Sequence, residues 1–311
     1  MLAYHPRMPV PHTAKGPKAQ IRPARQRPAS VPDGPAEQLG LAPGQSVELL
    51  KELHILTREG KLNQDTRRKL KQVYHLVQFI EPLLGEVLKA RGDVTLADHG
   101  AGKSYLGFIL YDLFFKDKSV GHVYGVESRA ELVDKSRALA QRLGFARMAF
   151  LATTVQHALT HPELPATIDV VTALHACDTA TDDAIAFGLA KQAQFMVLVP
   201  CCQAEVAGVM RSNKALSLSR TPLAELWRHP LHTREFGSQI TNVLRCLQLE
   251  AHGYSVTVTE LVGWEHSMKN ELILARKMTD DRGGARARSR ERLLQVLETL
   301  NLQELTQRFA V

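Results

Sequence analysis

Cysteine is scarce in this sequence of 311 residues, which has only Cys177, Cys201, Cys202 and Cys246. So few thiols cannot form the disulfide framework of a small secreted protein, and they fit a reducing compartment. No apolar run approaches the roughly 20 residues that span a bilayer, and no signal-type apolar segment opens the chain. We therefore expect a cytoplasmic protein that does not use a membrane. The hydrophobic content of 44% is that of a globular protein with a full core.

Acidic residues are absent from residues 1–32, which hold six bases. This stretch belongs to a proline-rich segment, residues 1–44, without apolar periodicity, and such a composition predicts a disordered basic tail. A transit peptide is the competing interpretation, but the prolines oppose the amphipathic helix that it needs. Residues 276–292 form a second basic cluster. The net charge of +7 therefore resides in the tails, which would bind a polyanion.

Two helices are expected in residues 45–90, at 46–59 and 64–89. The second has an apolar stripe at helical spacing and basic residues around its other side, Arg67, Arg68, Lys69 and Lys71. A solvated face is the simple interpretation of these bases. The alternative is a contact with RNA beside the main domain, through Arg67, Arg68 and Lys71.

Strand and helix patterns alternate over residues 91–278, which predicts a mainly parallel sheet covered by helices on both faces. Seven strands are expected, at 94–98, 122–127, 147–151, 168–174, 194–199, 254–262 and 270–276, the last two as an antiparallel hairpin. The polar stretch 203–237 is either a substrate lid or a surface insertion. Residues 279–311 are a basic linker and an amphipathic helix, which we expect to dock on the domain or on a second copy.

The first strand ends in the turn Asp98-His-Gly100-Ala-Gly102-Lys-Ser104. It lacks the first glycine of a Walker A loop, because Ala97 stands there, and the third glycine of a dinucleotide fingerprint, because Tyr105 stands there. A ligand with an adenosine and an amino acid but no phosphate remains. Gly100 and Gly102 would admit it, Asp98 would receive its ammonium group directly or through water, and Glu127, at the end of the second strand, would bind its ribose. This combination favours S-adenosylmethionine.

Ligands of such sheets lie beyond the carboxyl ends of the strands, which directs attention to the loop after the fourth strand. It contains His175, Cys177, Asp178 and Asp182. Asp178 or Thr179 is placed to cap the next helix, with acids that complement the helix dipole. Capping does not account for His175 or Cys177, so His175 is expected to face the cofactor, and Asp178 and Asp182 are candidate proton acceptors.

The loop after the fifth strand contains Pro200-Cys201-Cys202-Gln203. Three interpretations of the cysteines stay open: small packing residues, zinc ligands together with His175 and Cys177, or a nucleophile at Cys201 that adds to a pyrimidine ring. The spacing disfavours zinc, so no metal is assigned. Glu265 and His266 join the last two strands and return to the same edge of the sheet, where they would assist the methyl acceptor.

Four motifs in order carry a resemblance to class I S-adenosylmethionine-dependent methyltransferases, in the group that includes the methyltransferase-like 25 proteins and the C-terminal domain of the glutathione S-transferase C-terminal-domain-containing protein. They are Asp98-His-Gly-Ala-Gly-Lys-Ser-Tyr-Leu106, His175-Ala-Cys-Asp-Thr-Ala-Thr-Asp182, Pro200-Cys-Cys-Gln203 and Glu265-His-Ser-Met-Lys-Asn270. The resemblance implies a Rossmann-like seven-stranded sheet and S-adenosylmethionine as cofactor, to which the apolar periodicity adds an N-terminal helical extension and a C-terminal helix. Thr154 stands where the group often has an acid for adenine contact.

These observations predict a methyltransferase that acts on RNA by direct in-line transfer. A protein or small-molecule acceptor is the alternative within the same class of enzyme. The alternative from another class is a non-catalytic module with this fold that binds RNA or protein.

Overall fold

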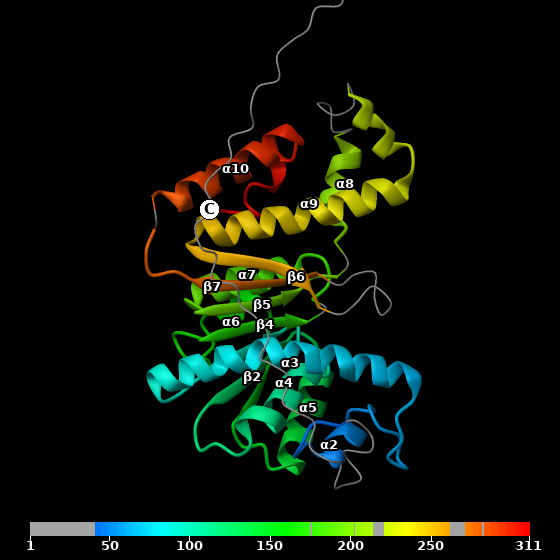
Figure 1. Ribbon diagram of the computed structural model, residues 1–311, viewed down its shortest axis with the longest axis vertical. Helices are drawn as coiled ribbons and strands as arrows, with labels where there is room; N and C mark the ends of the chain where they lie inside the picture. The colour runs from blue at the N-terminus through cyan, green and yellow to red at the C-terminus, as the bar shows by residue number, and fades with distance from the viewer. Residues whose placement is uncertain (1–40, 175, 202, 214–220, 262–270, 282) are drawn as a thin grey trace, which may run out of the picture.

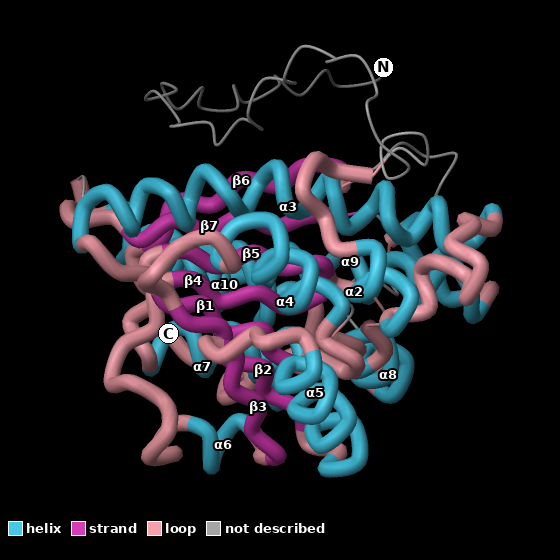
Figure 2. Tube along the Cα trace, turned by 90° about the horizontal axis from the view of Figure 1, so that it is seen from below, coloured by secondary structure: helices cyan, strands magenta, loops and turns pink. Residues whose placement is uncertain are grey.

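The computed structural model describes residues 41–174, 176–201, 203–213, 221–261, 271–281 and 283–311 (Figure 1). Its centre is a seven-stranded sheet in the order β3-β2-β1-β4-β5-β7-β6. Figure 2 shows the strands in this order, from β6 at the top to β3 at the bottom. The five strands β1 to β5 pair in parallel, while β7 runs antiparallel to both β5 and β6, so β6 and β7 form the predicted antiparallel hairpin. The predicted α/β fold class is confirmed.

The strand boundaries are close to those expected. The strands are β1 (Thr95–His99), β2 (His122–Glu127), β3 (Met148–Ala152), β4 (Val170–Leu174), β5 (Phe195–Val199), β6 (Tyr254–Glu260) and β7 (Glu271–Lys277). The sheet separates two apolar layers. Alternate side chains of the central strands, such as Leu96 and Ala97, enter opposite layers.

One layer holds α2 (Val47–Glu52), α3 (Gln64–Arg91), α4 (Tyr105–Leu110), the π-turn η1 (Tyr111–Phe115) and α5 (Ala130–Arg142). α3 begins with a reciprocal capping box between Asn63 and Thr66, and it ends at Gly92, whose φ of 75° favours glycine. The predicted helix 46–59 is wrong in length. The chain leaves the helix after Glu52, and His54 has a φ of 55° that a helix cannot continue through.

The other face is covered by α6 (Val155–Ala158), α7 (Ala180–Ala190) and part of α9 (Pro230–Ala251). Leu41, where the described chain begins, is buried in the core, although the sequence places it in the tail 1–44. No helix of the described residues is long and apolar enough to cross a membrane.

A third apolar cluster joins α8 (Glu205–Ser212), α9 and α10 (Ala285–Thr299), which form a layer beyond β6 and β7 (Figure 1). Short 3₁₀ segments η3 (Pro222–Trp227) and η4 (Gln303–Leu305) flank these helices. The C-terminal helix thus docks on the domain, which is one of the two arrangements that the sequence suggested. The described parts of 203–237, the predicted lid or insertion, contain α8, η3 and the first turns of α9. Gly237 permits the contact of α9 with α8, because a Cβ would lie 2.6 Å from that of Ala207.

Candidate active site

The glycine turn after β1 has the backbone conformation that the sequence predicts. Gly100 and Gly102 have φ values of 64° and 57°, in the left-handed region that favours glycine. The N–H of Gly100 donates to the carbonyl of Val126 at 2.9 Å, and the N–H of Gly102 donates to Glu127 Oε2 at 2.8 Å. These bonds fix the turn against the carboxyl end of β2.

Glu127 is the acid at that end, and its side chain is held ionised. It accepts two hydrogen bonds from the guanidinium of Arg129, at 2.9 and 3.1 Å, besides that from Gly102. Burial alone would raise the pKa of Glu127, but the hydrogen bonds from Arg129 and Gly102 outweigh it and lower the pKa to about 2. The Arg129 side chain is 60% exposed, so it can leave and let the carboxylate accept ribose hydroxyls.

A cavity of about 440 Å³ opens over the carboxyl ends of β1 to β4. The strand order reverses between β1 and β4, where open α/β sheets bind ligands. Of the predicted cofactor residues, Gly100, Glu127 and Thr154 line this cavity, and Gly102 is tied to it through Glu127. Its remaining lining includes His99, Arg129, Ala176, Cys177 and Asp183.

Asp98 does not line the cavity, which corrects its predicted contact with an ammonium group. Its side chain lies on the opposite side of β1 from His99, and only 2% of the residue is exposed. Asp98 Oδ1 accepts from the Thr172 hydroxyl at 2.9 Å, and the carboxylate also accepts from the N–H of Gly107. Burial raises the pKa of Asp98 to about 6, although these two hydrogen bonds oppose the rise. Asp98 therefore ties β1 to β4 and α4.

Asp178 caps a helix, but not the one that the sequence suggests. Its Oδ1 accepts from the N–H groups of Ala204 and Glu205 at 3.0 and 3.3 Å, at the start of α8. Thr179 is the N-cap of α7 without a side-chain hydrogen bond. Because Asp178 joins the loop after β4 to the loop after β5, its predicted role as a proton acceptor does not fit.

Asp182 is likewise occupied. Both of its carboxylate oxygens accept from Arg245 of α9, at 2.8 and 2.7 Å, and neither side chain is more than 5% exposed. Arg245 also donates to the carbonyl of Asp178 at 2.8 Å. The prediction that Asp182 accepts a proton in the cleft is corrected: this carboxylate is half of a buried ion pair that fixes the loop.

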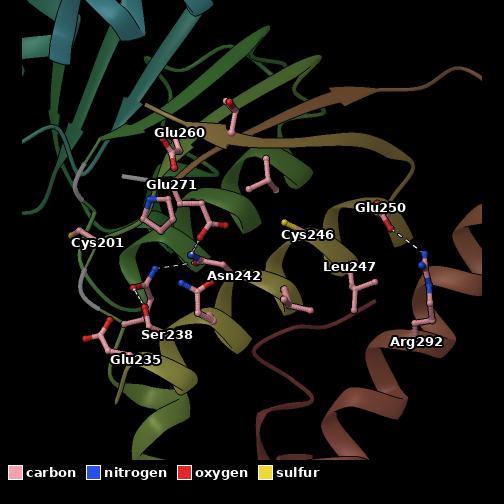
Figure 3. A pocket seen from close by; sticks show the side chains of 16 residues that line it. Cys201, Glu235, Ser238, Asn242, Cys246, Leu247, Glu250, Glu260, Glu271 and Arg292 are labelled. Carbon is pink, nitrogen blue, oxygen red and sulfur yellow. Dashed lines mark hydrogen bonds and ion pairs between the residues drawn. The ribbon is translucent and has the colours of Figure 1, made fainter. Parts of the chain in front are cut away.

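A chain of polar contacts continues from Arg245 into a second cavity. Asn242 Oδ1 accepts from Arg245 and from Gln203 at 3.2 and 3.0 Å, and Asn242 Nδ2 donates to Glu271 at 2.7 Å. Figure 3 shows Asn242 between Ser238 and Glu271 in this cavity, whose volume is about 710 Å³. Its wall also includes Cys201, so the cavity begins at the loop after β5.

The two described cysteines of the strand-end loops lie side by side. The sulfur atoms of Cys177 and Cys201 are 3.2 Å apart. Cys177 lines the first cavity and Cys201 lines the second, so the pair marks the place where the two cavities adjoin. Among the described residues, no group of three or more His, Cys, Asp or Glu side chains is arranged to hold a metal ion. The predicted site residues His175, Glu265 and His266 lie outside the described residues.

Three residues of the site escaped the sequence analysis. Arg129 had a local signal, two residues after Glu127, but Arg245 pairs with an acid 63 positions away. His99 precedes the glycines of the turn, and only the folded structure shows that it lines the cavity.

Comparisons with known proteins agree with this geometry. Residues 68–209 match a family model described as a methyltransferase domain. Over residues 68–209 the chain is therefore similar to a methyltransferase domain. This match confirms the resemblance drawn from the sequence, the S-adenosylmethionine-dependent class and the cofactor of that class.

A curated relative is the bovine glutathione S-transferase C-terminal domain-containing protein, which is 24% identical over 235 residues. The match covers 70% of this chain and 34% of the relative, so the chain spans about a third of that protein's length.

Two solved structures are similar to parts of the chain. An rRNA methylase from Streptococcus thermophilus is 10% identical, with coverage of 65% of this chain and 96% of its own and a TM-score of 0.41. Magnesium protoporphyrin IX methyltransferase from Synechocystis PCC 6803, with bound SAH, is 15% identical, with coverage of 74% and 94% and a TM-score of 0.41.

Proposed function

We propose that this protein is an S-adenosylmethionine-dependent methyltransferase that acts on RNA in the cytoplasm by direct in-line transfer. The observation that carries the activity is the cavity at the strand-order reversal, with the ionised Glu127 at one wall and the glycine turn at another. A buried carboxylate fits ribose hydroxyls, and a turn without Cβ atoms fits a close-lying ligand. The residues present therefore fit the cofactor.

When bound, S-adenosylmethionine supplies a methyl group on a positively charged sulfur. The chain's own residues orient the reactants. Glu127 would hold the ribose, the turn around Gly100 would support the cofactor, and the second cavity, which begins at Cys201, would receive the acceptor. Positioning of two reactants can contribute about 7–11 kcal/mol. Since Asp178 and Asp182 are committed to helix α8 and to Arg245, we assign no dedicated base to either.

RNA is proposed as the substrate because exposed arginine and lysine side chains lie on the α2–α3–α5 side of the molecule. Arg67, Arg68 and Lys71 are exposed on the first turns of α3, which lie at the same end of the sheet as the loop after β5 (Figure 1). Lys103, Lys135 and Arg142 border a hollow between α2 and α5. Such bases bind phosphates with release of counterions. The basic segments 1–32 and 276–292 add to this charge.

A cationic protein or small-molecule acceptor is the second candidate, favoured by the charge of the second cavity. Its lining includes four glutamates, Glu235, Glu250, Glu260 and Glu271, beside Arg292, which is paired with Glu250 (Figure 3). A carboxylate-lined wall repels phosphate and attracts an amine. A module without catalysis is the alternative from another class, and the same experiment separates all three.

The test is methyl transfer from S-adenosylmethionine labelled in its methyl group. The purified chain is incubated separately with total RNA, with the protein fraction and with the small-molecule fraction of the source cells, and the labelled product is identified by mass spectrometry. Labelled nucleosides in RNA would support the proposal, and labelled protein or a labelled small molecule would support the second candidate. Absence of label in all three fractions, with cofactor binding intact, would favour the non-catalytic module. Glu127→Gln, which should bind the cofactor more weakly, serves as the impaired control.

A further inference from the structure

His99 is a buried imidazole in the wall of the cofactor cavity. It is the last residue of β1, and only 5% of it is exposed. Neither Nδ1 nor Nε2 has a hydrogen-bond partner in the structure as described. The ring packs against Phe187 of α7, with 5.6 Å between the ring centroids. Buried polar groups are nearly always paired, so this ring lacks the partner that its position calls for.

The ring is uncharged at neutral pH. Burial lowers the pKa of His99 to about 4, although the negative charge of Glu127 acts in the opposite direction. A neutral imidazole offers one N–H donor and one acceptor nitrogen. It can therefore pair with a zwitterionic group, and it does not repel a cationic sulfur as an imidazolium would.

The lining of the cavity indicates which part of the cofactor reaches this ring. Glu127 on β2 would hold the ribose, and Thr153 and Thr154 after β3 line one side of the cavity, which would receive the adenine. The opposite side, toward β4, is formed by His99, Ala176 and Cys177. The methionyl part of a cofactor held in this way would lie toward His99. Asp98, which the sequence assigned to this part, faces Thr172 on the other side of β1.

We propose that His99 hydrogen-bonds the aminoacyl group of S-adenosylmethionine and thereby positions the sulfonium toward the second cavity. This inference rests on the proposed function, since it assigns a residue to the same cofactor. It replaces Asp98 with its neighbour in sequence as the polar contact of the methionyl end.

The experiment compares three ligands by calorimetry: S-adenosylmethionine, S-adenosylhomocysteine and 5′-methylthioadenosine, which lacks the aminoacyl group. His99→Phe keeps an aromatic ring against Phe187 and removes both nitrogens. We expect it to weaken the first two ligands about tenfold or more, as for a lost hydrogen bond to a charged group, and to leave methylthioadenosine unchanged. The matched control is His122→Phe, which removes an exposed imidazole at the amino end of β2.

The possible outcomes separate this inference from the proposed function. Equal weakening of all three ligands, or of none, would overturn the role of His99 while the wild-type binding still supports the proposed function. A wild type that binds none of the three would overturn both. Should His99→Phe fail to fold, ¹⁵N spectra of the wild-type histidines decide: the ring nitrogens of His99 should shift with S-adenosylhomocysteine and not with methylthioadenosine. The same shift with both ligands would refute the contact.

Discussion

Arg245 and Asp182 form a two-pronged ion pair in the interior of the domain, with side chains that are 1% and 5% exposed. The pair joins α9 to α7, although the two residues are 63 positions apart in the chain. Through its further bond to the carbonyl of Asp178, Arg245 also fixes the loop that forms one wall of the cofactor cavity.

The first prediction is that Arg245→Met destabilises the protein by about 3–5 kcal/mol, because it leaves the Asp182 charge buried without its partner. Urea denaturation measures the change. Arg228→Ala is the control, since Arg228 and Glu225 are 69% and 70% exposed and such pairs contribute about 0–1 kcal/mol. The double variant Arg245→Met with Asp182→Leu should recover much of the loss. Equal effects of Arg245→Met and Arg228→Ala would show that the buried pair does not stabilise the fold.

The strands were predictable because their signals are local. β5 is a run of five buried residues, Phe195–Val199, and its apolar sequence identifies it without tertiary information. The first turns of α9 fall within the polar stretch 203–237, where no apolar stripe marks a helix. Pro230 stands at the first helical position, where its missing N–H removes no bond.

Site residues were predictable where they belong to one local turn or strand end. They were not predictable where their hydrogen-bond partners come from distant segments of the chain. Glu127 and the glycines were found because Glu127 ends β2 and the glycines come directly after β1. Asp178 and Asp182 were predicted to accept protons, but in the structure they accept hydrogen bonds from Ala204 and Arg245. Both donors lie far along the chain from the two aspartates. Such pairings depend on the packing of α8 and α9, which no local pattern encodes.

The second prediction concerns Glu127, the proposed ribose contact. Glu127→Gln should weaken the binding of S-adenosylmethionine about tenfold or more, because a charged hydrogen bond contributes about 1.5–3 kcal/mol. Titration calorimetry provides the affinities. Glu131→Gln, an exposed change on α5, is the matched control. Unchanged affinity in Glu127→Gln would show that the cofactor does not bind at Glu127.

The third prediction is a pH dependence of stability that arises from Asp98. Its pKa is about 6 in the folded protein, above the ordinary value of 3.8, so the folded state holds the proton more tightly than the unfolded chain. Stability from this group is present at low pH and is lost as the pH rises to about 6. Relative to Asp98→Asn, the wild type should lose about 2 kcal/mol between pH 4.5 and 7.5.

Denaturation of both proteins at the two pH values measures this difference. Asp134→Asn, in an aspartate whose side chain is 72% exposed, is the control and should show no such change. Parallel pH curves for the wild type and Asp98→Asn would mean that Asp98 is ionised as easily in the fold as in the unfolded chain.

The fourth prediction tests RNA through the basic N-terminal segment. Deletion of residues 1–40 removes six bases and leaves Leu41 in the core. Each base that neutralises a phosphate contributes about −0.7 to the slope of log affinity against log salt on single strands, so the slope should flatten by up to about 4. Filter binding to single-stranded RNA at several salt concentrations gives the slope. A slope that does not change would contradict RNA binding through this segment and favour the second candidate, the cationic acceptor.

The last prediction sets direct transfer against a covalent route through Cys201. A pyrimidine C5 is too weak a nucleophile to attack the sulfonium unaided, so a thiolate would first have to add to the ring. A nitrogen, oxygen or sulfur acceptor can attack directly, and the cavity beside Cys201 then needs only to orient it. We expect direct transfer. Cys201→Ser should retain methyl transfer, whereas loss of an essential nucleophile lowers kcat on the order of 10⁴-fold or more.

A 5-fluoropyrimidine-substituted RNA pool distinguishes the two routes, because a covalent route traps the protein on such RNA. Cys246→Ser is the control, since burial raises the pKa of the Cys246 thiol to about 12 and makes it a poor nucleophile. With direct transfer, wild type and both variants give no adduct that survives denaturation. An adduct that forms with the wild type and with Cys246→Ser but disappears with Cys201→Ser would establish the covalent route, and with it Cys201 as the nucleophile at the border of the two cavities.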